Sequence, residues 1–252
     1  MKIYNTVLLS LMTTIICRAP SGYRLIWNDE FDKGYIESSK WGFDIGGNGW
    51  GNNELQYYTS NWENAYVEDN LLHIRVNRVY YNGRDYTSAR LLTRGKFDFK
   101  YGYVEARISL PRLSGIWPSF RMFGRNIDSV GWPNCGEIDI LETINEENKS
   151  YATCYWFNNG LTEYGLSSRY FDVTQFHTYS LYWDRERIQV FIDNKKIYEI
   201  NIRDGARNTS AFHNSFFLML NVAVGGNRPG WNIDNNSLPA EMLIDYVRVY
   251  QP

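Results

Sequence analysis

The segment Gly136-Glu-Ile-Asp-Ile-Leu-Glu142 alternates acidic and apolar residues before it ends on a third acid. Side chains of an extended strand point alternately to its two faces, so Glu137 and Asp139 share one face and the isoleucines pack into the core on the other. Glu142 stands an odd number of positions from Glu137 and would point toward the core. A single bulge residue, Ile140 or the leucine after it, returns Glu142 to the acidic face. The segment therefore predicts a bulged strand that carries a row of carboxylates.

Carboxylates in one row repel one another, so at least one of them has a raised pKa and shares a proton. Such a row suits hydrolysis of a glycosidic bond: an ionised Glu attacks the anomeric carbon, while a protonated Glu donates to the leaving oxygen and then activates water. A retaining pair stands about 5–5.5 Å apart, whereas an inverting pair needs a wider gap. Glu137 and Glu142, leaning together over Asp139, favour retention. The alternative interpretation is an exposed acidic strand face without a chemical role.

The rest of the chain is rich in short segments with the alternation or β-branched content of strands, separated by Gly, Asn and Asp. No segment keeps a helical period beyond a turn or two. The expected strands include residues 71–77, 102–110, 178–183, 188–192, 196–202 and 242–250, with a hairpin turn at 193–195. Many short antiparallel strands in one domain predict an all-β sandwich of two packed sheets.

The composition is that of a globular protein: 252 residues, 44% hydrophobic and 21% charged. The formal net charge of -2 leaves no broad basic field, so we expect neither nucleic acid nor an anionic membrane as a partner. Aromatic residues make up 17% of the chain. They suit either strand packing or a wet cleft that stacks sugars, and composition alone does not separate the two.

The N-terminal residues 1–21 have the features of a secretory signal peptide, because Lys2 precedes a short apolar stretch at 6–16. That stretch is too short to span a membrane comfortably. We therefore expect a secreted, extracellular protein whose single domain covers residues 22–252. Without the signal, Cys135 and Cys154 remain, and they could form one bridge in an oxidising compartment. We expect a monomer, because no feature of the sequence demands a partner chain.

The acidic segment, preceded by Trp132-Pro-Asn-Cys-Gly136, resembles glycoside hydrolase family 16, and within it the laminarinase-like endo-β-1,3-glucanases. Further segments resemble the family in the same order along the chain. They are residues 25–31, 49–58, 86–90, 102–108, 115–120, 221–226 and 244–251. The resemblance implies a concanavalin A-like β-jelly-roll of two curved antiparallel sheets with a concave substrate cleft. It also implies retaining hydrolysis of β-1,3-glucosidic bonds with no required cofactor.

The same resemblance assigns roles to the acidic residues: Glu137 is the nucleophile, Asp139 its assistant, and Glu142 the general acid/base. Trp117 and Trp132 match family tryptophans that line the cleft, where an indole face stacks on a pyranose ring. A Trp in a strand is otherwise more often a core residue. We interpret Trp27, Trp41 and Trp183 in this way, as core residues.

Polar positions that bind glucose hydroxyls in the family correspond to Asn53, Arg90 and Asn221. Arg90 has a plain alternative interpretation as an ion-paired sheet arginine. Many family members also bind one structural calcium ion, for which Glu30 and Asp245 are candidates here. A lone Asp is a poor calcium signature, because the ion prefers six to eight oxygen ligands.

Three positions depart from the family pattern: Arg121 and Arg228 stand where tryptophan is common, and Tyr155 stands where histidine is usual. Tyr155 can still hydrogen-bond a sugar but carries no charge near neutral pH. We expect all three changes to lie near sugar subsites and none to touch the carboxylates. The arginines could favour an anionic or substituted glucan.

The leading hypothesis is a secreted endo-β-1,3-glucanase that acts on laminarin-like β-glucans. A second hypothesis, from another class, is a non-catalytic β-glucan-binding recognition protein. The intact acids Glu137, Asp139 and Glu142 argue against it. A third is a sibling glycosidase that acts on mixed-linkage β-1,3-1,4-glucan or on a galactan.

Overall fold

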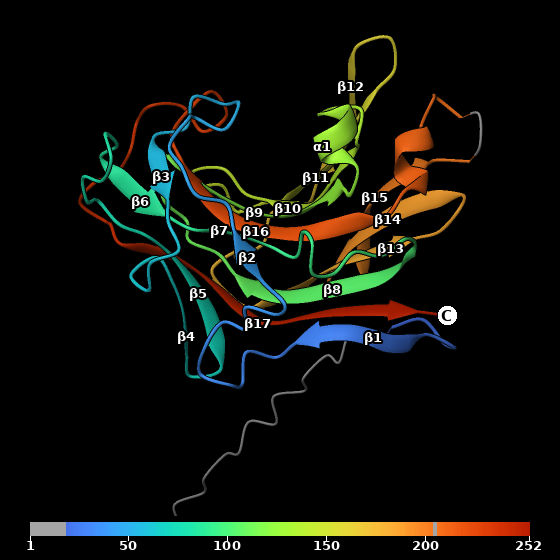
Figure 1. Ribbon diagram of the computed structural model, residues 1–252, viewed down its shortest axis with the longest axis horizontal. Helices are drawn as coiled ribbons and strands as arrows, with labels where there is room; N and C mark the ends of the chain where they lie inside the picture. The colour runs from blue at the N-terminus through green and yellow to red at the C-terminus, as the bar shows by residue number, and fades with distance from the viewer. Residues whose placement is uncertain (1–18, 204–205) are drawn as a thin grey trace, which may run out of the picture.

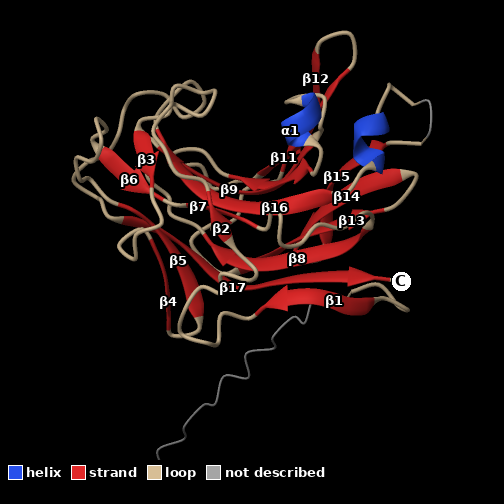
Figure 2. Cartoon of the chain, viewed as in Figure 1, coloured by secondary structure: helices blue, strands red, loops and turns tan. Residues whose placement is uncertain are grey.

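The computed structural model describes residues 19–203 and 206–252. Nearly all of the expected signal segment, residues 1–21, lies outside the described residues. The described chain consists almost wholly of strands packed as two large antiparallel sheets, which confirms the expected jelly-roll sandwich (Figures 1 and 2). In residues 19–203 and 206–252, no helix has the length and apolar character needed to cross a membrane.

The first of the two sheets, called here the inner sheet, carries the acidic strand. Its order is β12 (Leu161–Ser167), β11 (Tyr151–Phe157), β10 (Glu137–Glu142), β9 (Ile116–Gly124), β16 (Phe216–Val224), β7 (Arg90–Leu92) and β2 (Gly42–Phe43). Every residue of β10 and β16 is buried. Even those side chains of β10 and β16 that face away from the core are therefore screened from bulk water.

The second sheet, called here the outer sheet, lies against the other face of the core (Figure 1). Its order is β15 (Lys195–Asn201), β14 (Arg187–Ile192), β13 (His177–Trp183), β8 (Gly102–Ser109), β17 (Ala240–Gln251), β5 (Leu71–Val76) and β4 (Ala65–Glu68), and β1 (Arg24–Asp29) also pairs with β17. The hairpin between β14 and β15 turns through Asp193 and Asn194, with φ of 47° and 65°. Positive φ at both central residues is what a two-residue type I′ turn requires.

Four small elements complete the described chain. Strands β3 (Gln56–Tyr58) and β6 (Tyr86–Ser88) form a short parallel pair beside the inner sheet, and α1 (Ile127–Val130) and the 3-10 turn η1 (Ser210–His213) are single turns. In Figure 1, the loops around β3 and β6 rise at one end of the inner sheet, and α1 and β12 rise at the other. The inner sheet thus forms a floor between two raised ends.

The core lies between the sheets, and strand alternation places the side chains in it. In β5 and β14, buried residues alternate with partly exposed ones, as the period of two requires. Trp41 and Trp183 are buried core residues, and Trp27 packs against the core while partly exposed. Cys135 and Cys154 are both buried free thiols. The bridge that the sequence left open does not form, because the two thiols pack in different hydrophobic clusters.

Candidate active site

The bulge expected in β10 is present at Ile140. Between Asp139 and Leu141, β10 advances two residues while its neighbour β9 advances one, so Ile140 is the extra residue. Ile140 and Leu141 are adjacent in sequence, yet both belong to the hydrophobic core. Glu142 therefore returns to the same side as Glu137, away from the core.

The three acids line a cleft of about 500 Å³ on the inner sheet. The cleft lies above the floor that Figure 1 shows between the raised ends of the sheet. Five of the predicted binding residues line it: Arg90, Trp117, Trp132, Tyr155 and Asn221. Other residues without a predicted binding role line it as well, among them Trp50, Asn52, Glu54, Arg121 and Arg228. The strands that supply them are distant in sequence and adjacent in the fold.

Glu137 is held by a donor on each of its carboxylate oxygens. Arg121 Nη1 donates to Oε1 at 2.8 Å, and Trp132 Nε1 donates to Oε2 at 2.6 Å. A cationic donor and an indole donor together fix the orientation of the carboxylate. This arrangement suits a carboxylate that attacks from one defined direction.

Glu142 has an asymmetric environment. Its Oε1 accepts hydrogen bonds from Trp117 Nε1 and Arg121 Nη2, both at 3.0 Å. Its Oε2 is buried and has no hydrogen-bond partner among the described residues. Burial raises the pKa of Glu142, and the charge of Arg121 opposes that effect. A proton on Glu142 therefore belongs on Oε2, because no donor among the described residues occupies that oxygen.

Asp139 lies between the two glutamates and is 1% exposed. Burial raises its pKa well above the usual value, and the negative charges of Glu142 and Glu137 raise it further. Neither of its oxygens accepts a hydrogen bond from the described residues. The raised pKa favours the protonated form of Asp139, which lies beside Glu137 and is placed to share that proton.

Arg121 contradicts the expectation that the departures from the family pattern leave the carboxylates untouched. Besides its bonds to Glu137 and Glu142, its Nε lies 3.5 Å from Asp139 Oδ1. The reason is register: Arg121 on β9 lies directly opposite Asp139 on β10. Spacing along one strand carries no information about the residue across from it, so the sequence analysis missed this contact.

The two predicted tryptophans differ in exposure. Trp132 is 47% exposed and presents its ring to the cleft, where a sugar can stack on it. Trp117 is 5% exposed, and the Arg121 guanidinium lies 5.3 Å from the centre of its ring. Trp117 therefore lines the cleft, as expected, and its indole N–H supports Glu142.

The predicted polar residues also differ in their contacts. Asn221 is buried, accepts a hydrogen bond from Ser119 Oγ at 2.7 Å and donates to Tyr58 Oη at 3.0 Å. Arg90 does form the ion pair that its alternative interpretation foresaw, with Asp44 at 3.1 Å, and it still lines the cleft.

Tyr155 on β11 lies opposite Glu137 on β10. The centres of the Tyr155 and Trp132 rings are 6.2 Å apart. Asn53 is exposed, lies outside the cleft lining and donates to Asn227 Oδ1 at 3.1 Å. Its neighbour Asn52 lines the cleft in its place.

Glu54 is a fourth buried acid in the cleft that the sequence analysis did not find. Its Oε2 accepts a hydrogen bond from Gln56 Nε2 at 2.6 Å, and burial raises its pKa. It follows Asn52 and Asn53 in a loop without strand alternation, so no local pattern indicated that its side chain turns inward.

The calcium candidates are both engaged in ion pairs. Glu30 accepts two hydrogen bonds from Arg248, at 2.8 and 2.6 Å, and Asp245 pairs with Arg107 at 2.5 Å. In the described ranges, no group of three or more His, Cys, Asp and Glu side chains could hold a metal ion. The structure therefore does not support the two predicted ligands.

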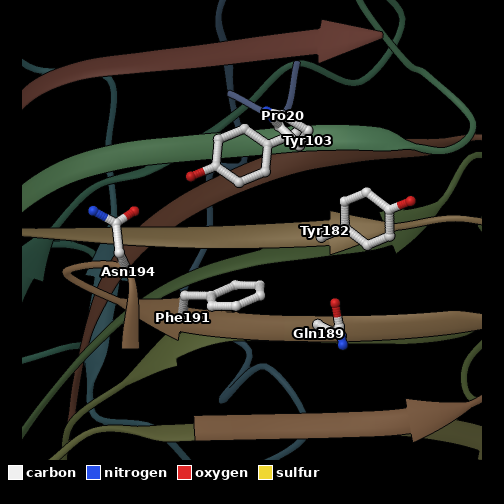
Figure 3. Close-up of a pocket in the computed structure, with 6 residues that line it drawn as sticks. All are labelled: Pro20, Tyr103, Tyr182, Gln189, Phe191 and Asn194. Carbon is white, nitrogen blue, oxygen red and sulfur yellow. The ribbon is translucent and has the colours of Figure 1, made fainter. Parts of the chain in front are cut away.

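A second hollow, of about 240 Å³, lies on the outer sheet (Figure 3). Its wall consists of Tyr103, Tyr182, Phe191, Gln189 and Asn194, with Pro20 at one side. It has aromatic rings and amides but no acid, whereas the cleft on the inner sheet combines aromatic rings with four carboxylic groups. Aromatic residues alone do not distinguish the two surfaces.

Comparison with known proteins agrees with the site. Residues 52–248 match the family model described as glycosyl hydrolases family 16. The chain is 39% identical over 244 residues to a β-glucanase of Rhodothermus marinus, covering 91% of this chain and 85% of that protein. The solved structure of the laminarinase from Rhodothermus marinus matches with a TM-score of 0.85 and 40% identity, covering 91% of this chain and 97% of the other.

A third relative differs in length. The chain is 41% identical over 241 residues to the clotting factor G alpha subunit of Tachypleus tridentatus, covering 94% of this chain. The match covers only 35% of that relative.

Proposed function

The chain belongs to family 16 of the glycosyl hydrolases, and we propose that it cleaves internal β-1,3-glucosidic bonds of laminarin-like β-glucans with retention at the anomeric carbon. One observation carries the proposal: Glu137 and Glu142 reach the same cleft from one bulged strand, and both bind the same guanidinium. The half-exposed Trp132 beside Glu137 offers a stacking surface for the sugar.

In the first step, the carboxylate of Glu137 attacks the anomeric carbon. The bond from that carbon to the leaving oxygen breaks, and Glu142 gives its proton to this oxygen. The products are a glycosyl ester on Glu137, a carboxylate on Glu142 and a released glucan end. Oε2 of Glu142, which has no donor in the described part of the chain, is the oxygen suited to carry the proton.

In the second step, the Glu142 carboxylate takes a proton from water, and the water oxygen attacks the anomeric carbon from the face that the leaving group vacated. The ester bond breaks and Glu137 is released as a carboxylate. Two displacements at one carbon restore the original β-configuration.

The direct test is release of reducing sugar from laminarin by the wild type and by Glu137→Gln. We expect turnover by the wild type and a loss of at least about 10³-fold in the variant, because an amide cannot act as the nucleophile. Binding of laminarin by the wild type without turnover would support the glucan-binding hypothesis and contradict hydrolysis.

Two further measurements define the reaction. Proton NMR of the earliest product should show the β-anomer, and an initial α-anomer would refute retention. Turnover on a panel of laminarin, lichenan, agarose and carrageenan should be fastest on laminarin. Faster turnover of lichenan or a galactan would move the specificity to a sibling substrate.

We further propose that the protein acts outside the cell as a monomer, after removal of residues 1–21, and that it needs no cofactor. The basic residue and short apolar stretch at the N-terminus support export. N-terminal sequencing of the secreted protein and its mass in solution would test export and oligomeric state.

A further inference from the structure

We infer that Arg121 is a positioning residue of the reaction, whose one guanidinium holds both reacting glutamates and stays in contact with the negative charge as that charge moves from Glu137 to Glu142. The inference rests on the proposed hydrolase function. It concerns a residue that the sequence analysis placed away from the carboxylates.

Every nitrogen of the Arg121 guanidinium has a partner. Nη1 and Nη2 bind the two glutamates at 2.8 and 3.0 Å, and Nε donates to Ser119 Oγ at 3.1 Å. The side chain is 12% exposed and packs over the Trp117 ring. The planar guanidinium is therefore fixed in place, with Nη1 on Glu137 and Nη2 on Glu142.

The proposed reaction moves one negative charge from the glutamate bound by Nη1 to the glutamate bound by Nη2. Before attack, Glu137 is the carboxylate and Glu142 carries a proton; in the glycosyl ester, Glu137 is neutral and Glu142 is the carboxylate. An arginine keeps its charge in a protein. Arg121 thus faces one anion in both states without moving, and a fixed cation needs little reorganisation as charge shifts.

Other charged and titratable groups surround the row, but their contacts differ. They include Glu54 before β3, Tyr58 in β3, Arg90 on β7, Cys135 before β10, Cys154 and Tyr155 on β11, Glu163 on β12, Tyr198 on β15 and Arg228 in the loop after β16. Arg90 pairs with Asp44, and Arg228 packs over Tyr151 with 5.7 Å to the ring centre. Within residues 19–203 and 206–252, Arg121 alone forms ion pairs with the row of acids.

Removing the charge of Arg121 has a predictable consequence for the dependence of rate on pH. The acidic limb of kcat/KM reports ionisation of the nucleophile, and the basic limb reports loss of the proton from the acid/base. A cation that contacts both groups shifts both limbs of the profile to lower pH. Its loss should therefore move both limbs upward together.

The experiment compares the wild type, Arg121→Gln and Arg121→Lys on laminarin across pH. Arg121→Gln should lose at least about tenfold in kcat/KM and shift both limbs upward by about one pH unit or more. Arg121→Lys keeps the charge, so its limbs should stay near those of the wild type. Its kcat should still fall, because a single ammonium cannot bridge two carboxylates.

The matched control is Arg107→Gln, which removes an ion-paired arginine from the outer sheet. Its limbs should coincide with those of the wild type, and a shift as large as in Arg121→Gln would overturn the inference. A folded Arg121→Gln protein, shown by its circular dichroism and cooperative melting, with unshifted limbs would also overturn it.

If Arg121→Gln does not fold, Arg121→Lys decides. Wild-type limbs with a reduced kcat support the inference, whereas shifted limbs or a wild-type kcat contradict it. Turnover by the wild type keeps the two proposals separate: without turnover the proposed function fails and the inference with it, while turnover with unmoved limbs refutes the inference alone.

Discussion

The two sheets of this protein pair their acids differently. At the outer sheet, Glu30 accepts two hydrogen bonds from Arg248 and is neutralised by it. On the inner sheet, three carboxylates share the guanidinium of Arg121, and Asp139 and Glu142 keep buried oxygens without a hydrogen-bond donor among the described residues. Acids of the same chemistry thus differ in their supply of donors: each oxygen of Glu30 accepts a hydrogen bond, whereas Asp139 and Glu142 are not fully satisfied by the described residues.

The difference separates stability from reactivity. An acid paired with an arginine near the surface stays ionised and contributes modestly to folding. Buried acids that share too few donors have raised pKa values, so a proton remains available for transfer. The inner row therefore carries a cost in stability that the outer pairs do not, as is common where a site serves chemistry.

The largest expected contrast comes from removing one acid of each kind. Glu142→Gln should lower turnover of laminarin by about 10²–10⁴-fold, because the general acid is lost. The pKa of Glu142 is raised in the fold, so the native state binds more protons, and its unfolding free energy falls as pH rises through the range above the ordinary Glu pKa. At pH 7, the variant should therefore melt at or above the wild-type temperature.

Glu30→Gln is the matched outer change. It should leave kcat unchanged and lower the free energy of unfolding by about 0.2–1 kcal/mol, the usual range for a partly exposed ion pair. Thermal melts and initial rates on both variants check the contrast. A Glu142→Gln protein that melts several degrees below the wild type would contradict the expected contrast.

A smaller contrast lies within the cleft, between the two tryptophans that bind the glutamates. Trp117→Phe removes a buried donor from Glu142, and since that donor lowers the pKa of Glu142, the basic limb of kcat/KM should move upward. It should also cost about 1–3 kcal/mol of stability. In Trp132→Phe, water can replace the lost N–H because the ring is half exposed.

We therefore expect Trp132→Phe to melt like the wild type and to keep the wild-type basic limb. The measurements are pH–rate profiles and melting curves for the two variants side by side. Equal shifts in both would show that burial does not distinguish them.

The smallest effect is expected on the outer sheet, where His177 Nδ1 lies 2.6 Å from Asp193 Oδ2. The pair raises the pKa of His177 and, despite burial, the pKa of Asp193 is lowered. The stability from a raised His pKa is present below the ordinary value of about 6.5 and is lost as pH rises through the folded value. The stability that comes from a lowered Asp pKa is lost as pH falls through the folded-state pKa.

His177→Gln should therefore melt below the wild type near pH 5.5, with the gap closing by pH 9, and its kcat should be unchanged. The effect should stay under about 1 kcal/mol, because both side chains are partly exposed. A gap that widens toward pH 9 would contradict the assignment. Melting curves at the two pH values decide the matter.

Much of the fold and part of the site could be predicted, because the signals are local. Alternation located the strands, and the odd step from Glu137 to Glu142 required a bulge, which the structure has at Ile140. Positive φ at the β14–β15 turn followed from Asp and Asn. Each of these depends on neighbours within a few residues.

What escaped prediction depends on partners distant in sequence. Arg121 reaches the acids only because β9 and β10 pair in one particular register. Glu54 enters the cleft from a loop, and the Arg121 guanidinium lies over the Trp117 ring. Glu30 pairs with an arginine more than two hundred positions away.

The sequence by itself determined that this protein is a β-sandwich with three acids on one face of a bulged strand, since strand geometry has a period of two and needs no distant partner. The tertiary structure alone decided how those acids are held: Arg121 contacts all three carboxylates, each oxygen of Glu137 has a donor, and Oε2 of Glu142 has none from residues 19–203 and 206–252. Hydrogen-bond supply and burial set the pKa of a carboxyl group, and both arise only when separate strands and loops close around it.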